Sequence, residues 1–151
     1  MQLSHQLELL REAERELSAS LRESARAHAD YPEVQYTAEL LAGWSDGHVE
    51  RLGDVCERYA RGAPPAPPEL HGRLFQGPRS GPIGLLRDLQ DVFLQATHCD
   101  LSWTLVGQAA KGARDRDLLD VVEACERETT RTLQWTKTVL KANAVQALVV
   151  A

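Results

Sequence analysis

Two inward positions of the stretch LLAGWSDGHVERLGDV, residues 40–55, carry polar side chains where leucine is expected. Leu41 and Leu52 mark an apolar stripe at helical spacing, and His48 falls on the same stripe with Ser45 one turn before it. A neutral imidazole is a common metal ligand in proteins. A histidine on an inward face therefore indicates either a metal site or a polar core network in which a neighbouring group satisfies it.

Three acidic residues occupy comparable positions elsewhere in the chain. Glu14 lies inside a leucine stripe, Asp100 lies toward the inner face of its segment near Trp103, and Glu126 lies at the edge of an apolar face. Buried charges are unfavourable unless they are paired or bound to a metal. Carboxylates and imidazole together form a ligand set for Fe, Mn or Zn, with water completing the coordination shell.

Four long amphipathic helices are the elements that must position these residues. Apolar residues recur at alternating spacings of three and four. The pattern predicts helices over residues 4–28, from 31 or 32 to 61, from 82 or 83 into AAKGARD, and from 116 to 141 or beyond. Asp30 and Asp115 are the expected N-caps, and Gly112 is the expected residue after the third helix. No period-two run of Val and Ile indicates a strand.

A Pro/Gly-rich segment, residues 62–82, separates the second helix from the third. Each helix of about 25 to 30 residues is about 40 Å long, and this segment spans the same length when extended. Within it, PELHGRLFQ is expected to form a short helical turn. The chain is therefore expected to form one domain, residues 1–151, of all-α class: a four-helix bundle of two antiparallel hairpins joined by a long crossover.

The hairpin turns set the height of each inward polar residue. If the first hairpin reverses near residue 31, Glu14 lies level with His48. If the second reverses near residue 113, Asp100 lies level with Glu126. We therefore expect all four groups near mid-bundle, where they can hold one divalent ion with His48 as its only nitrogen ligand.

This arrangement resembles the ferritin-like superfamily, which includes ferritins, bacterioferritins and rubrerythrins. Its di-iron members take one Glu from each of two helices and a Glu-x-x-His motif from each of the other two. Glu14 and Asp100 match the lone acids, SDGH matches one motif with Ser45 in the Glu place, and ERET matches the other with Thr129 in the His place. The resemblance implies a ferritin-like fold and a degenerate metal site (Glu14, His48, Asp100, Glu126) with an iron-handling or redox role.

The same residues also permit a metal-free structure. Two of the six expected ligands are hydroxyl groups, and Glu14 or Ser45 can satisfy His48 within the core. Glu126 either points inward or is solvated, and His28 is expected to cap or pack at the end of the first helix. The alternative function is a metal-free helical interaction or assembly protein.

Two apolar features point outward. The third helix carries a second stripe, within about 40° at about 100° per residue, made of Leu94, Leu101 and Leu105. The C-terminal tail, residues 143–151, is apolar and needs a groove on this subunit or on a partner. The stripe favours a homodimer, because two-fold dimers are the commonest oligomers. The crossover offers another cover through Leu70, Leu74 and Phe75.

Net charge and cysteine content argue against some kinds of partner and favour one cellular location. A net charge of −5 argues against nucleic acid or an anionic membrane as partner, since both need a basic face. The cysteines, Cys56, Cys99 and Cys125, are widely spaced and odd in number, so no disulfide framework is expected and a reducing cytoplasm is favoured. The N-terminal stretch lacks the features of a signal peptide, and no apolar run is long enough to span a membrane.

Overall fold

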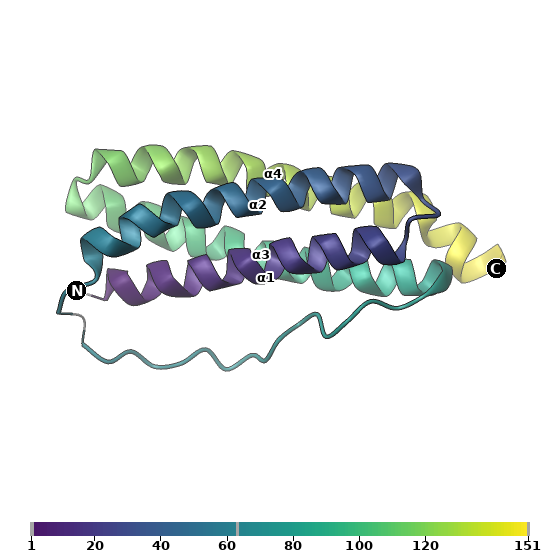
Figure 1. Cartoon of the computed structure of the whole chain (residues 1–151), viewed down its shortest axis with the longest axis horizontal. Helices are drawn as coiled ribbons and strands as arrows, with labels where there is room; N and C mark the ends of the chain where they lie inside the picture. Colours follow the sequence, from purple (N-terminus) through teal and green to yellow (C-terminus); the bar gives the residue numbers. More distant parts are fainter. Residues whose placement is uncertain (1, 63, 151) are drawn as a thin grey trace.

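Four long helices lie side by side in the computed structural model, which describes residues 2–62 and 64–150 (Figure 1). They are α1 (Leu3–Ala27), α2 (Pro32–Tyr59), α3 (Gly81–Ala113) and α4 (Arg116–Val145). A turn of π-helix, η1 (Gln146–Val150), continues α4. The described residues contain no strand, so the predicted all-α four-helix bundle is confirmed. The predicted crossover includes Ala63 and the predicted tail includes Ala151, and both lie outside the described residues.

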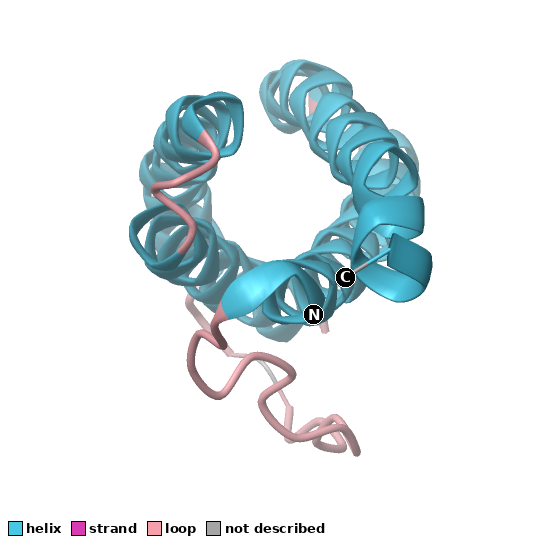
Figure 2. Cartoon of the chain, turned by 90° about the vertical axis from the view of Figure 1, so that its right-hand side faces the viewer, coloured by secondary structure: helices cyan, strands magenta, loops and turns pink. Residues whose placement is uncertain are grey.

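The helices form two antiparallel hairpins, α1 with α2 and α3 with α4, and α1 packs against α3. The crossover leaves the end of α2 and runs the length of the bundle before α3 begins, so α2 and α3 are parallel (Figure 1). Seen along the bundle axis, it lies outside the ring of helices (Figure 2). The expected helical turn in PELHGRLFQ does not form: this segment contains no helix, bends at Leu70 and Leu74, and buries Phe75.

The core follows the apolar stripes of the sequence. α1 supplies a row of fully buried leucines: Leu7, Leu10, Leu17 and Leu21. Trp103 of α3 is the largest fully buried side chain among the described residues. The inner faces also bury several hydroxyl side chains, including Ser18, Ser45, Ser102, Thr129, Thr132 and Thr136. The bundle therefore has a mixed interior in which polar groups need hydrogen-bond partners.

The helix ends follow local capping rules with two corrections. Pro32 occupies the first turn of α2, but the N-cap is Tyr31 and not Asp30, and no side chain caps this end. Asp115 caps α4, as predicted, by accepting a hydrogen bond from the Leu118 backbone N–H at 3.0 Å. The left-handed residue after α3 is Arg114, with φ of 55°, and not Gly112. The turn is short, so the reversal falls directly before the Asp115 cap.

Asp88 of α3 anchors the second end of the crossover. Its buried carboxylate accepts hydrogen bonds from His28 Nε2 at 2.7 Å, from the Arg79 backbone N–H at 3.0 Å and from the Arg79 guanidinium at 2.9 Å. His28 is the C-cap residue of α1, so its expected capping or packing role is confirmed. This contact fixes where the crossover joins α3. No helix in the described chain is both long and apolar enough to cross a lipid bilayer.

Candidate functional site

One side chain from each helix meets in a network within the bundle core. Glu14 Oε1 accepts hydrogen bonds from Trp103 Nε1 at 2.8 Å and from His48 Nδ1 at 3.0 Å. His48 Nε2 lies 3.3 Å from Glu128 Oε1. Glu14 and His48 are at most 2% exposed. The network therefore joins α1, α2, α3 and α4 through polar contacts at one level of the bundle.

Local sequence explains why these side chains point inward. Glu14 replaces one member of the leucine row of α1, and His48 replaces one apolar member of the stripe on α2. The Trp103 indole needs a hydrogen-bond acceptor when it is buried, and Glu14 supplies it. The His48 and Trp103 rings also pack edge to face, with centroids 5.8 Å apart. The Trp103 ring and the Glu14 carboxylate together fix the orientation of the His48 imidazole.

The electrostatics of the network favour a charged His48. Burial lowers the pKa of His48, but hydrogen bonds with the Cys125 side chain and with Glu14, and the charge of Glu14, outweigh burial and raise this pKa to about 10. An imidazolium donates from both ring nitrogens, which matches a carboxylate on each side. At neutral pH the network is therefore a cation held between Glu14 and Glu128. A metal ion at His48 must first displace a proton.

The other two predicted ligands lie apart from this network. Asp100 and Glu126 are both partly exposed, and burial together with the charge of Asp100 raises the pKa of Glu126. The charge of Asp100 acts on Glu126, so the four predicted ligands form two pairs. Glu14 and His48 lie inside the bundle, and Asp100 and Glu126 lie at the contact of α3 with α4. Within the described ranges, no group of three ligand atoms within 4.8 Å includes any of these four residues. Their role as metal ligands stays a prediction.

Among the described residues, three buried side chains have polar atoms without a hydrogen-bond partner. They are Glu14 at Oε2, Ser24 at Oγ, and Gln95, whose amide nitrogen and oxygen are both buried. Unsatisfied buried groups are unusual and indicate an additional occupant such as water or an ion. Glu14 therefore presents one oxygen that the protein itself does not use.

Sequence reasoning found Glu14 and His48 but missed Trp103 and Glu128. The signal for Trp103 is that a buried indole needs a hydrogen-bond acceptor, which an inward acid can supply. Glu128 lies at the margin of its helix face, where a glutamate is usually solvated, so its spacing gives no signal of an inward contact. Its side chain is 29% exposed and still reaches His48.

Comparison of the chain with protein-family models, with curated proteins and with solved structures finds no match.

Proposed function

We propose that the protein is a helical interaction module whose chains associate through the outer face of α3. The observation that carries this proposal is a row of exposed apolar side chains on that helix. Their exposed fractions are 47% for Ile83, 51% for Leu94, 60% for Leu101 and 58% for Leu105. Leu94, Leu101 and Leu105 are grouped together, and the exposed Arg87 and Gln90 separate Ile83 from them. Soluble monomers tend to avoid such grouped exposed leucines.

These four residues form one line, which we call the outer stripe. They lie within about 40° of one another around the helix, and the line is about 33 Å long at about 1.5 Å per residue. The opposite face of α3 is committed to the core through Leu85, Leu89 and Trp103, all fully buried. The outer stripe is therefore a second apolar face that the core cannot cover.

The crossover does not cover the outer stripe. Its Phe75 is fully buried and its Leu70 is 99% exposed, while the stripe residues keep about half of their surface open. The alternative cover considered from the sequence therefore leaves the stripe available. This availability supports a second copy of the chain as the occupant.

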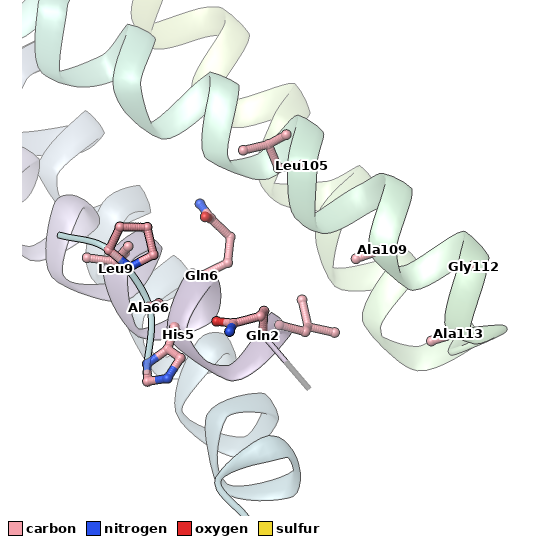
Figure 3. A pocket seen from close by; sticks show the side chains of 11 residues that line it. Gln2, His5, Gln6, Leu9, Ala66, Leu105, Ala109, Gly112 and Ala113 are labelled. Carbon is pink, nitrogen blue, oxygen red and sulfur yellow. The ribbon is translucent and has the colours of Figure 1, made fainter. Parts of the chain in front are cut away.

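A hollow of about 750 Å³ adjoins one end of the outer stripe at Leu105 (Figure 3). Leu9 of α1, Ala109 of α3 and Ala66 of the crossover also line it. The exposed apolar tail lies at the other end of the bundle and comprises Val145, Leu148, Val149 and Val150 (Figure 1). If two α3 helices pair in antiparallel fashion about a two-fold axis, the tail of one copy comes to the end that carries its partner's hollow.

The mass of the chain in solution tests this proposal. Burying one half-exposed leucine contributes roughly 1 kcal/mol, so the outer stripe and the tail together supply several kcal/mol toward association. Light scattering at micromolar concentration is expected to report a dimer. Leu101→Glu is expected to give a monomer with unchanged helical content. The matched control is Leu40→Glu on α2, where the leucine is 46% exposed and the dimer should persist. A monomeric wild-type chain overturns the proposal.

A second candidate function, favoured by the unpartnered Glu14 Oε2, is binding of a single Fe, Mn or Zn ion in the core. Such an ion would take Glu14 and His48 as ligands and would carry the iron-handling or redox role implied by the ferritin-like resemblance. Elemental analysis of the purified chain tests it. Stoichiometric metal that is lost in His48→Ala supports this function, and absence of metal with no uptake on addition rejects it.

A further inference from the structure

A second polar cluster lies outside the bundle core, where the crossover passes α3. Glu69 Oε1 is 2.8 Å from His98 Nε2, and Glu69 Oε2 is 3.0 Å from His71 Nε2. The two imidazole rings stand edge to face with centroids 4.7 Å apart. In the part of the chain that the structure describes, this is the one set of three His, Cys, Asp or Glu ligand atoms that lie within 4.8 Å of one another.

The fold holds the three side chains together from both sides. Glu69 and His71 lie on either side of a bend at Leu70 in the crossover, and Glu69 contacts both His71 and His98 of α3. Before the cluster, the crossover is tied to α1 by a hydrogen bond from His5 Nε2 to the Pro64 carbonyl at 2.6 Å. After it, Phe75 is fully buried. The cluster is therefore preorganised and is not a chance encounter of free loops.

The hydrogen bonds of His71 leave Nε2 available as a ligand. Its Nδ1 lies 3.2 Å from the backbone carbonyl oxygen of Gly72. A carbonyl only accepts, so Nδ1 carries the hydrogen, and a cation can replace the proton on Nε2 without breaking this bond. Metal-bound histidines are usually oriented by such a bond from the other ring nitrogen.

We propose that Glu69, His71 and His98 bind one divalent transition-metal ion of the zinc type. Two imidazoles and one carboxylate suit Zn²⁺ and its first-row neighbours better than Mg²⁺ or Ca²⁺, which prefer all-oxygen shells. Three protein ligands leave a fourth position for water. The cluster opens into a small hollow of about 130 Å³ that Glu12, Glu16 and Arg73 also line. The carboxylates of Glu12, Glu16 and Glu69 outnumber the one guanidinium of Arg73, so the net charge of the lining favours a cation there.

The ion fastens the crossover to α3 beside the outer stripe. His98 lies one helical turn from both Leu94 and Leu101. This inference shares no residue with the core network and does not rest on the proposed association. Its failure and the failure of the proposed function are therefore separate results.

Calorimetric titration of the full chain with Zn²⁺ tests the inference directly. One ion per chain is expected, and His71→Ala and His98→Ala are each expected to weaken binding by about tenfold or more, since even loss of an outer-shell partner costs that much. Glu57→Ala is the control, because this exposed carboxylate lies on α2 and outside the cluster. Absence of uptake, or equal binding by wild type and His98→Ala, overturns the inference. Loss of binding in His48→Gln with unchanged binding in His98→Ala places the ion in the core and also overturns it.

Limited trypsin digestion tests whether the bound ion holds the crossover against α3. Arg73 is exposed two residues after His71, and Arg61 is exposed at the start of the crossover. Zn²⁺ is expected to slow cleavage after Arg73 several-fold and to leave cleavage after Arg61 unchanged, which controls for any effect of zinc on the protease. In His98→Ala, protection of Arg73 should disappear. Equal protection after Arg61 and after Arg73 would contradict an ion that holds only the part of the crossover near His98.

Discussion

Replacing Glu14 with Gln keeps the shape of the side chain and removes its charge. The amide oxygen can still accept from Trp103 Nε1 and His48 Nδ1, so packing in the core should persist. The imidazolium of His48 then retains one carboxylate neighbour, Glu128, whose side chain is 29% exposed and lies 3.3 Å away. We therefore expect the pKa of His48 to fall, because Glu14 is a main cause of its elevation.

The size and the pH window of the effect follow from the pKa of His48. A rise from 6.5 to about 10 corresponds to roughly 5 kcal/mol of stabilisation, as an upper figure, at about 1.4 kcal/mol per pH unit. Since the folded-state pKa is the higher one, this stabilisation is fully present below pH 6.5 and is lost as pH rises toward 10. Contacts with Cys125 and Glu128 remain in Glu14→Gln, so the variant is expected to lose about 3 kcal/mol at pH 7. It should also show a shallower decline above that pH.

Urea unfolding between pH 6 and pH 9.5, with the His48 ring protons followed by NMR, measures both quantities. The control is Glu8→Gln, which changes an exposed glutamate of the same helix and should leave the free energy of unfolding and the His48 titration unchanged. The reasoning is refuted if wild-type His48 titrates near 6.5. It is also refuted if Glu14→Gln and Glu8→Gln unfold alike across this range.

Two glycine substitutions are expected to change the free energy of unfolding in opposite directions. Gly84→Ala should lower the free energy of unfolding by about 1–3 kcal/mol, because the new Cβ would lie 2.8 Å from the Arg79 backbone carbonyl carbon. Gly43→Ala should raise it by up to about 1 kcal/mol, because alanine favours a helix interior and a Cβ there meets no atom within 4 Å. Urea midpoints of the two variants check both, and a stabilised Gly84→Ala would show that the crossover yields easily at Arg79.

The pairing of Glu14 with His48 could be predicted because it is set within one hairpin. Once the turn near residue 31 is located, the rise per residue fixes which positions of α1 and α2 are level. Both residues also replace apolar members of their stripes, so they point inward together. The observed contact of 3.0 Å between them is therefore a consequence of local sequence.

Contacts between the two hairpins could not be predicted in the same way. Glu126 and Glu128 lie about 80° on either side of the buried stripe of α4 and are equivalent from the sequence. The rotation of α4 in the bundle decides between them, so Glu128 turns toward His48 on α2 and Glu126 toward Asp100 on α3. That rotation depends on the packing of all four helices and not on any local pattern.

The crossover was the hardest segment to predict from its residues. PELHGRLFQ has apolar residues that fit a short helix, but burial of Phe75 and the bonds of Arg79 to Asp88 hold the segment in a non-helical conformation. Its register along α3 is therefore set by contacts far apart in the sequence. The meeting of Glu69 and His71 with His98 follows from that register, so composition alone gave no indication of it.

The core network explains why the bundle keeps charges where apolar side chains would pack. Leucine rows allow two hairpins to slide by a turn at little cost, because one leucine resembles the next. The Glu14 carboxylate accepts hydrogen bonds from both the Trp103 indole and the His48 imidazole. Only one register of the helices brings both donors to its Oε1. Any slip leaves a buried charge without partners, which is far more costly than a lost apolar contact. We infer that Glu14 sets the register of α1 against α2 and α3, while the His48 contact with Glu128 sets α2 against α4, so that the two hairpins lock at a single height.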